Sequence, residues 1–362
     1  MQVIDMQTMK EAIKQIVIRK NRPCIFIGPS GCGKSEGVEQ VCAEEGVFMS
    51  RFMLGQYDSV DLKGTPWVRD RSGYQDTVWH PASTLPFEGN PAFPDDRPIL
   101  LHFDEATSGT VPVLGIMYQL TQERRVGEHK LKDNVRIVLS GNRESDKGIV
   151  NRFPMPLCNR LTWYELQPTV QAFSLHAQAI GVDPVCVAFL NWQKPKLHTF
   201  DPKSPDKVFA TPRSWVTAMD YYSDTTMSRA LKEASISGSI GAGICAEFYA
   251  FVEHWRMIAK LMPSILKTPE TAQVEFLKET DENDINGRPI FVNDPSMQYA
   301  VAVSISGSMK DDHTCTAYNT YLKRMPLEFM VMAWSLAIAR DENLHKMDAF
   351  ITFSKANKAT WS

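Results

Sequence analysis

Short apolar runs recur along the first half of the chain, and segments with helical patterning separate most of them. The runs occupy residues 24–28, 46–54, 98–106, 134–142 and 160–166. Parallel strands that are buried on both faces have nearly continuous apolar sequences, because neither face meets water. The alternation therefore predicts an α/β domain whose parallel five-stranded sheet is covered by helices on both sides.

Helical spacing of apolar residues begins near the start of the chain. From Met6 to Ile16 these residues recur at intervals of three or four behind Asp5, which can cap a helix. We therefore predict an amphipathic helix over residues 5–19 that ends before Pro23.

The character of the chain changes after Leu166. Strand-like runs give way to helical patterns at residues 169–181, 241–262 and 327–339, and a polar stretch broken by Pro and Gly separates the last two. The second half is therefore expected to be helical. The predicted divisions are an α/β domain at 1–166, a helical domain at 167–265 and a helical C-terminal extension at 266–362.

A long segment with no clear periodicity lies between Gly55 and Arg97. It is rich in Gly, Pro, Asp and Trp and is too long for a plain connection, so we interpret it as a functional insertion. Trp67 and Trp79 flank a turn-rich stretch, which predicts a hairpin that presents side chains to a partner. The alternative is that both tryptophans pack onto the core.

Composition narrows the class of protein. The chain has 362 residues, of which 43% are hydrophobic, so it is long enough for two or three folded domains and wholesale disorder is excluded. Lys and Arg total 39 against 42 Asp and Glu, and the formal charge of -3 leaves no whole-chain basic field for nucleic acid. Seven cysteines without a CxxC pair favour neither a disulfide framework nor a zinc site.

The N-terminal segment carries charged residues, and no stretch of the chain reaches membrane-spanning length. The sequence therefore predicts a cytoplasmic protein with no membrane association.

The strongest chemical signal is GPSGCGKS at residues 28–35, which matches GxxxxGK[ST] and lies between a predicted strand and a predicted helix. Backbone N–H groups of such a loop cradle phosphates at a helix N-terminus, while the lysine neutralises β/γ oxygens and the hydroxyl binds Mg²⁺. The pattern predicts a nucleotide site. Its residues are Gly28, Pro29, Ser30, Gly31, Cys32, Gly33, Lys34 and Ser35.

A second signal is ILLHFDEA at residues 99–106. Asp104 and Glu105 end a buried strand at the sheet edge where open α/β proteins bind their ligands. Asp104 can hold the magnesium shell of a nucleotide, and Glu105 can polarise water for in-line attack on the γ-phosphate.

Three further polar residues are candidates for contact with the nucleotide. Asn142 ends the fourth run and can orient the attacking water, although a single Asn after Ser-Gly is also an ordinary turn residue. Arg160 is the first residue of the fifth run, and Arg213 lies in the helical region. Phosphoryl transfer needs cationic groups at the γ-phosphate, but either arginine can equally be a surface residue paired with a carboxylate.

Taken in order, GPSGCGKS, SVDLKGTPW, ILLHFDEA, VRIVLSGN, PLCNRL and ATPRSW resemble the MoxR-type (dynein-related) branch of the AAA+ ATPases, over about residues 5–262. The resemblance implies hydrolysis of ATP with Mg²⁺. The roles it implies are Walker A for Lys34 and Ser35, Walker B for Asp104 and Glu105, sensor 1 for Asn142, a finger acting on the neighbouring subunit's nucleotide for Arg160, and sensor 2 for Arg213.

The same resemblance implies a hexameric ring with nucleotide at the subunit interfaces and an α-helical lid at 167–265. It also implies an insertion at about residues 55–86 and a hairpin at about 124–135. The partners that it implies are further copies of the chain and a protein client or a von Willebrand A-type protein. Arg152 competes with Arg160 for the finger role, because Leu161 stands where the family usually has an aromatic residue.

Two other functions remain open beside remodelling of a protein partner. A nucleic-acid motor is possible through a local basic track at residues 124–132, although the net charge disfavours it. A slow nucleotide-dependent switch or scaffold is the other alternative, since Glu105 argues against an inactive ATPase but not against a slow one. The histidines show no paired spacing, so we expect no metal beyond nucleotide-bound Mg²⁺.

Overall fold

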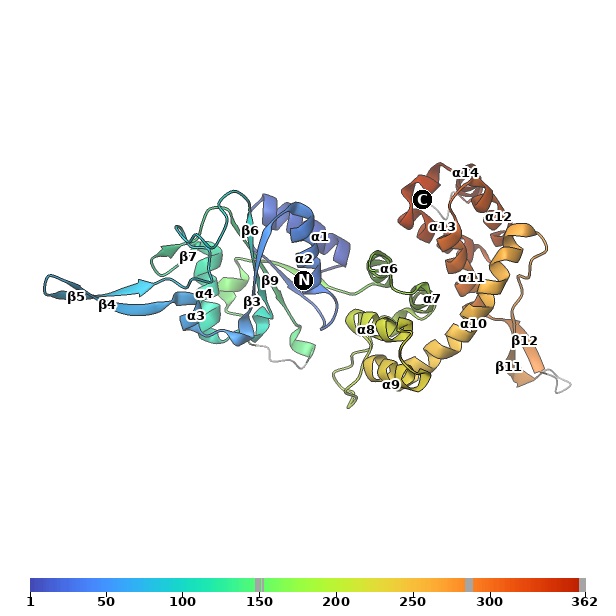
Figure 1. Cartoon of the computed structure of the whole chain (residues 1–362), viewed down its shortest axis with the longest axis horizontal. Helices are drawn as coiled ribbons and strands as arrows, with labels where there is room; N and C mark the ends of the chain where they lie inside the picture. The colour runs from blue at the N-terminus through green and yellow to red at the C-terminus, as the bar shows by residue number, and fades with distance from the viewer. Residues whose placement is uncertain (147–150, 152, 284–288, 358–362) are drawn as a thin grey trace. The chain divides into compact units, whose positions relative to one another are not determined.

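The computed structural model describes residues 1–146, 151, 153–283 and 289–357, with the backbone alone at 254, 256, 259, 277–283, 289–292 and 296. The described residues form two compact units, and Figure 1 labels most of their helices and strands. The first, which we call the sheet unit, comprises Met1–Ala172 with Phe200–Pro205 and Thr211–Arg213. The remaining described residues form the helical unit.

The sheet unit is built on one parallel sheet of six strands in the order β1-β10-β2-β9-β6-β3. This confirms the predicted α/β class. The strands are β1 (Gln2–Ile4), β2 (Cys24–Ile27), β3 (Phe48–Met53), β6 (Ile99–Asp104), β9 (Val135–Gly141) and β10 (Thr162–Leu166). The prediction of five strands missed β1, because three residues at a sheet edge are too few to show a periodic pattern.

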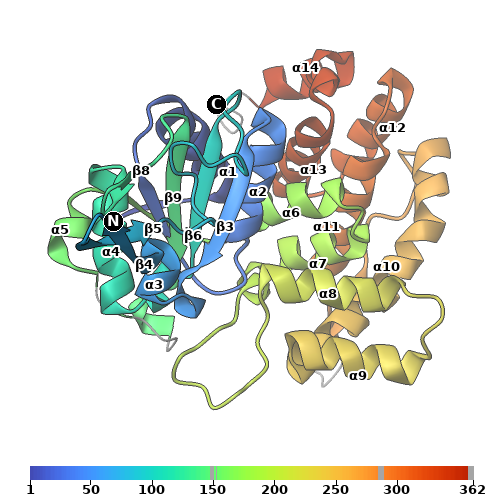
Figure 2. The same cartoon turned by 60° about the vertical axis from the view of Figure 1, so that its left-hand side comes forward.

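Each face of the sheet carries its own apolar core. On one face Phe26, Leu100 and Val138 pack with residues of α1 (Met6–Ala12) and α2 (Lys34–Glu45). On the other face the strands pack against α4 (Val111–Gln122). Figure 2 shows α1 and α2 on one side of the strands and α4 on the other. Burial on both faces explains why these strands have nearly continuous apolar sequences.

The predicted first helix is present but changes its winding. Asp5 caps α1 by accepting a 2.8 Å hydrogen bond from the backbone N–H of Thr8, which satisfies one of the unpaired donors of the first turn. The chain then continues as the π-helix η1 (Ile13–Arg19), so the helical segment has the predicted extent.

The insertion after β3 contains the short helix α3 (Ser59–Lys63) and the antiparallel hairpin of β4 (Thr65–Arg71) and β5 (Tyr74–His80). Gly64 lies where the hairpin begins with φ of 85°, and a Cβ there would come within 1.8 Å of the His80 carbonyl oxygen. Only glycine fits at this position.

Both tryptophans of this hairpin are exposed to solvent, Trp67 at 66% and Trp79 at 40%. The two strands of the hairpin are joined by Arg69, which donates two hydrogen bonds of 3.1 and 2.6 Å to the carboxylate of Asp76. The alternative in which both tryptophans pack onto the core is therefore wrong. Val68 and Tyr74 of the same hairpin are exposed as well, and several exposed apolar side chains on one element are typical of a surface that contacts a partner.

A second, short hairpin of β7 (Arg125–Val126) and β8 (His129–Lys130) lies within the predicted 124–135 segment. Its neighbour Leu131 forms an isolated antiparallel bridge with Phe87, so the end of the long insertion and this hairpin meet.

The helical unit contains an aromatic core centred on Phe189, whose ring contacts those of Trp215, Phe248 and Phe251. Its helices include α7 (Pro184–Trp192), α8 (Pro212–Ser223), α9 (Arg229–Ile240), α10 (Ala242–Lys267), α11 (Pro295–Ser308), α12 (Asp312–Leu322), α13 (Leu327–Arg340) and α14 (Asp348–Ala356). Helix α6 (Val170–Ala179) begins in the sheet unit and continues into the helical unit, and the first two residues of α8, Pro212 and Arg213, also belong to the sheet unit.

The polar stretch before α11 forms a hairpin of β11 (Leu277–Asn283) and β12 (Pro289–Asn293), which the sequence analysis did not expect. The predicted boundary between a lid and a C-terminal extension at residue 265 lies inside this one compact unit, and that division remains a prediction. Among the described helices, none combines the length and the apolar character that crossing a membrane requires.

Candidate functional site

The glycine-rich loop lies between β2 and α2, at the carboxyl edge of the sheet. Gly31 and Gly33 have φ of 72° and 91°, in the left-handed region that glycine adopts without a steric penalty. A Cβ at Gly31 would also come within 2.7 Å of the Thr211 hydroxyl. The loop therefore needs glycine for two reasons. It leads directly into the N-terminus of α2, where the first backbone N–H groups have no acceptor within the helix.

Lys34 is the first residue of α2, and its side chain folds back over the loop. Nζ donates hydrogen bonds to the carbonyls of Gly28 and Pro29 at 2.8 and 2.9 Å, and to Oδ1 of Asn142 at 3.1 Å. The side chain is buried, so its positive charge is held at the loop rather than in bulk solvent. Asn142 comes directly after β9, and its backbone N–H donates to the hydroxyl of Thr107 at 3.1 Å.

Asp104 ends β6 and is 4% exposed. Its Oδ2 accepts hydrogen bonds of 2.5 Å from the Ser35 hydroxyl and from Nη2 of Arg51. Its Oδ1 accepts from the Ser140 hydroxyl and from the backbone N–H of Glu105. Burial raises the pKa of Asp104, but the neighbouring His102 and the hydrogen bonds outweigh it and lower the pKa to about 2, so the carboxylate is ionised at neutral pH.

His102 is connected to the Asp104 carboxylate through the Ser140 hydroxyl. It is fully buried, and its Nε2 lies 2.8 Å from the Ser140 hydroxyl. Burial lowers the pKa of His102 to about 4 despite the attraction of Asp104, so the ring is neutral at pH 7. Because Ser140 gives its proton to Asp104, Nε2 must carry the proton that Ser140 accepts. His102 and Ser140 thus hold the orientation of Asp104.

Glu105 follows Asp104 in a strained backbone conformation, with φ of 49° and ψ of 36°. A residue other than glycine costs about 1 kcal/mol or more in this left-handed region. The residue is exposed, so its carboxylate is accessible at the sheet edge that carries the loop. Such strain is common where a side chain must be held in a functional position.

The donor set fits a magnesium-bound nucleotide. A hydroxyl and an ionised carboxylate, from Ser35 and Asp104, are oxygen ligands of the kind that Mg²⁺ prefers, directly or through water. Beside them lie the backbone N–H groups at the N-terminus of α2 and the ammonium of Lys34, which together favour phosphate.

The two arginines singled out in the sequence differ in their surroundings. The backbone N–H of Arg213 donates to the Gly31 carbonyl at 3.2 Å, so this residue lies beside the loop within the sheet unit. Arg160 is far from the loop: Nη2 donates to the Tyr118 hydroxyl at 2.6 Å, and its guanidinium lies 3.4 Å from the ring centroid of Tyr118. The rival residue Arg152 lies outside the described residues.

The sequence analysis missed Arg51, His102 and Ser140. A signal was present for the last two, because each is a polar residue within an otherwise apolar strand, where an unpaired polar group is costly. Arg51 was harder to recognise. Its relevance follows from register, since β3 and β6 place Arg51 directly beside His102.

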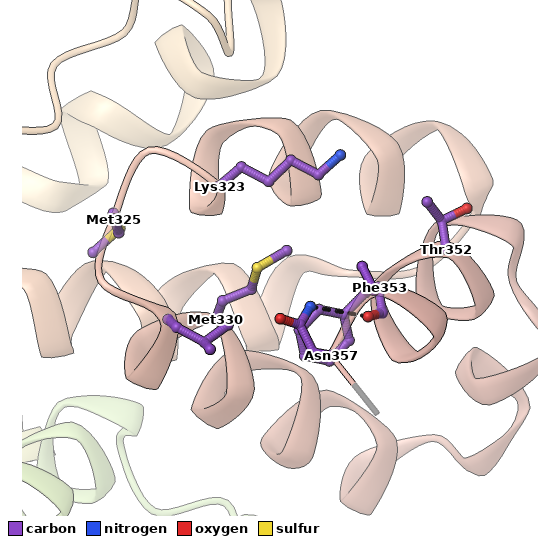
Figure 3. Close-up of a pocket in the computed structure, with 8 residues that line it drawn as sticks. Lys323, Met325, Met330, Thr352, Phe353 and Asn357 are labelled. Carbon is purple, nitrogen blue, oxygen red and sulfur yellow. Dashed lines mark hydrogen bonds between the residues drawn. The ribbon is translucent and has the colours of Figure 1, made fainter. Parts of the chain in front are cut away.

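A cavity of about 270 Å³ lies within the helical unit, apart from these residues (Figure 3). Its lining includes Met325, Met330 and Phe353, with Lys323 at one side. On one wall of the cavity, the Asn357 side chain donates a 3.0 Å hydrogen bond to the Phe353 carbonyl one helical turn earlier. The cavity is mainly apolar and contains none of the site residues named above.

No family model matches the chain, and no curated protein matches it. Among solved structures, the chain is similar to NtrX from Brucella abortus in complex with ADP, at 15% identity and a TM-score of 0.37, over 59% of this chain and 48% of NtrX. It is also similar to Hsp104 in a closed state with ATPγS and casein, at 15% identity and a TM-score of 0.33, over 80% of this chain and 48% of Hsp104.

A third similar structure is a point mutant of RuvB from Thermotoga maritima, at 14% identity and a TM-score of 0.39, over 72% of this chain and 75% of RuvB. The chain thus covers about half the length of NtrX and Hsp104. At these identities and scores the likenesses concern the fold alone, and any activity must be inferred from the site itself.

Proposed function

We propose that the chain is an AAA+ ATPase of the MoxR type, which hydrolyses ATP with Mg²⁺ in an oligomeric ring and uses the cycle to remodel or activate a protein partner. One observation carries the nucleotide part of this proposal. Ser35 and Asp104, from segments far apart in the sequence, meet at 2.5 Å beside a glycine-rich loop whose lysine reaches Asn142. A chance glycine-rich turn would not assemble these partners at one sheet edge.

In this proposal the loop binds the phosphates through its N–H groups, and Lys34 neutralises the charge of the β- and γ-phosphate oxygens. Ser35 and Asp104 would hold Mg²⁺, and the bound ion would neutralise charge that develops on the phosphate oxygens. The network of His102 and Ser140 beneath Asp104 keeps its carboxylate ionised and correctly turned. The binding residues are thus fixed before the nucleotide arrives.

The hydrolytic step in this proposal is in-line attack of water on the γ-phosphate. Glu105 accepts the proton of the attacking water, and Asn142 orients that water with its amide. The bond between water oxygen and γ-phosphorus forms as the bond to the β–γ bridging oxygen breaks, and ADP leaves with the displaced electron pair. Because Asn142 also contacts Lys34, the water and the phosphate charge are positioned by one connected set of side chains.

The assembly part of the proposal assigns Arg160 to the nucleotide of a neighbouring subunit and Arg213 to the nucleotide of its own. Residues 167–265 would act as a lid that moves on hydrolysis, and residues 266–362 as an extension that contacts partners. We propose a hexamer, with a protein client or a von Willebrand A-type partner. The contact of Arg213 with the loop carbonyl of Gly31 supports its share of this assignment.

Binding and turnover by the purified chain test the proposal. We expect one ATP or ADP bound per chain in calorimetry, and phosphate release in Mg²⁺ that stops in EDTA. Stimulation of turnover by DNA instead of protein would favour the nucleic-acid motor, and slow turnover that neither stimulates would favour the switch. No nucleotide binding in either buffer would contradict the proposal as a whole.

The exposed hairpin of β4 and β5 is expected to serve partner contact rather than catalysis. Deleting residues 68–78 should leave basal ATP turnover unchanged, because the hairpin contributes no residue to the site. It should remove the partner that co-purifies with the full chain from its native host, as identified by mass spectrometry. Trp67→Ser is the milder variant, since an indole that is 66% exposed contributes little to folding. Unfolding of both variants would instead assign the hairpin a packing role.

A further inference from the structure

Arg51 reaches the proposed magnesium ligand from a strand that the sequence motifs do not include. It lies on β3, at the edge of the sheet, and its guanidinium joins two carboxylates. Nη2 donates to Oδ2 of Asp104 at 2.5 Å, while Nη1 donates to Oε1 of Glu39 on α2 at 3.1 Å. The two acids differ in exposure, since the side chain of Asp104 is 5% exposed and that of Glu39 is 51% exposed.

We propose that Arg51 is a positioning residue that occupies Asp104 until magnesium-bound nucleotide displaces it onto Glu39. This inference rests on the proposed nucleotide function and adds to it the exchange of one cation for another at Asp104. It makes Arg51 a competitor of Mg²⁺ for the same carboxylate oxygen.

The hydrogen-bond inventory of Asp104 carries the argument. An ionised carboxylate has about four acceptor positions, and here Ser35, Arg51, Ser140 and the Glu105 N–H fill them. Any cation that is to use Oδ2 must therefore displace Ser35 or Arg51. Ser35 is itself an oxygen ligand for the same ion, whereas two cations on one carboxylate oxygen repel each other. Arg51 is therefore the group that leaves.

Glu39 gives the displaced guanidinium a place to go. It already holds Nη1, so Arg51 can release Asp104 without losing its other ion pair. The charge of Asp104 is compensated in both states, by Arg51 before nucleotide binds and by Mg²⁺ afterwards. This matters because an uncompensated carboxylate that is 5% exposed is costly.

Nucleotide affinity measured with and without Mg²⁺ tests the exchange. The probe is a fluorescent ADP analogue, titrated into the full-length chain in excess Mg²⁺ and again in EDTA. The readout is the dissociation constant in EDTA divided by the dissociation constant in Mg²⁺, so a larger ratio means that Mg²⁺ contributes more to binding. In Arg51→Met the competitor is gone, so this ratio should rise about fivefold to tenfold above that of the unaltered chain, the range for a hydrogen bond to a charged group that is partly screened by solvent. Arg51→Lys keeps a cation at this position, so its ratio should stay close to that of the unaltered chain.

Glu39→Gln should act in the opposite direction. Without its second carboxylate, Arg51 stays on Asp104 more firmly, and the ratio should fall below that of the unaltered chain. This variant keeps the Arg51–Asp104 pair intact, so it tests the exchange even where Arg51→Met fails to fold. Arg69→Met is the matched control, because it removes an arginine from an ion pair with Asp76 in the hairpin and should leave the ratio unchanged.

Other outcomes overturn the inference in distinguishable ways. An unchanged ratio in both Arg51→Met and Glu39→Gln would reduce Arg51 to a structural role. An equal loss of affinity in Mg²⁺ and in EDTA for Arg51→Met would mean that Arg51 contacts phosphate directly. If the unaltered chain binds no nucleotide under either condition, the proposed function fails and the inference with it.

Discussion

Replacing Lys34 with alanine is expected to abolish nucleotide binding, whereas Glu105→Gln should retain ATP and lose hydrolysis. Lys34 is buried and donates to two loop carbonyls, so it places a positive charge where the phosphates would lie. Glu105 lies exposed after the strand, and in the proposed mechanism it accepts a proton, a contribution that typically supplies roughly 10²–10⁴-fold in rate. Calorimetry with ATP and a phosphate-release assay measure the two properties separately.

Matched controls are available in the same unit. Lys14→Ala removes a lysine that is paired with Glu44 on the surface, and Glu88→Gln neutralises an exposed acid that is paired with Lys130. Both should behave like the unaltered chain. Equal loss of ATP binding in Lys34→Ala and Glu105→Gln would contradict the separate roles, provided that circular dichroism shows both variants folded.

Much of the sheet unit was predictable from local pattern. The strands β2, β3, β6, β9 and β10 lie within the predicted apolar runs, because a parallel sheet covered on both faces needs apolar residues at nearly every strand position. The cap at Asp5 was predictable for a similar reason, since it depends on a side chain and a backbone N–H three residues apart. Local chemistry is readable when its partners are close in sequence.

What was missed depends on partners that are distant in sequence. The three-residue strand β1 is defined by its register with β10, which no local window contains. Arg51 became a site residue only when β3 was placed beside β6. In the hairpin of β11 and β12, the polar strand β11 has little strand character of its own and is defined by its pairing with β12. Long-range pairing, not propensity, decides such elements.

The position of Arg160 indicates that it cannot serve the nucleotide of its own subunit. It precedes the amino end of β10, whereas the glycine-rich loop follows the carboxyl end of the neighbouring parallel strand β2. Gly28 lies against Leu166, six residues after Arg160, so about 20 Å of extended strand separate them. An arginine side chain is far shorter than that distance. Arg160 instead packs on Tyr118 of α4, away from the loop.

If Arg160 acts on the nucleotide of the next subunit, its loss should leave ATP binding intact and remove most hydrolysis. An arginine supplied by a neighbouring molecule contributes roughly 10³–10⁵-fold in rate in phosphoryl-transfer systems. Mixing Arg160→Ala subunits, which keep an intact loop, with Lys34→Ala subunits, which keep the arginine, should therefore restore some phosphate release. Interfaces that join an intact loop to an intact arginine form only in mixed assemblies, and each variant alone is expected to be inactive.

Tyr118→Phe is the matched control, because it removes the 2.6 Å hydrogen bond to Arg160 and keeps the guanidinium and the ring. It should retain turnover if Arg160 must leave Tyr118 to reach a neighbour, and it should lose turnover if the Tyr118 contact is itself what matters. Size analysis must show that the Arg160→Ala and Lys34→Ala chains assemble together. Mixed assemblies without restored activity would exclude Arg160 as the arginine that acts between subunits, and Arg152→Ala would then be mixed with Lys34→Ala in the same assay.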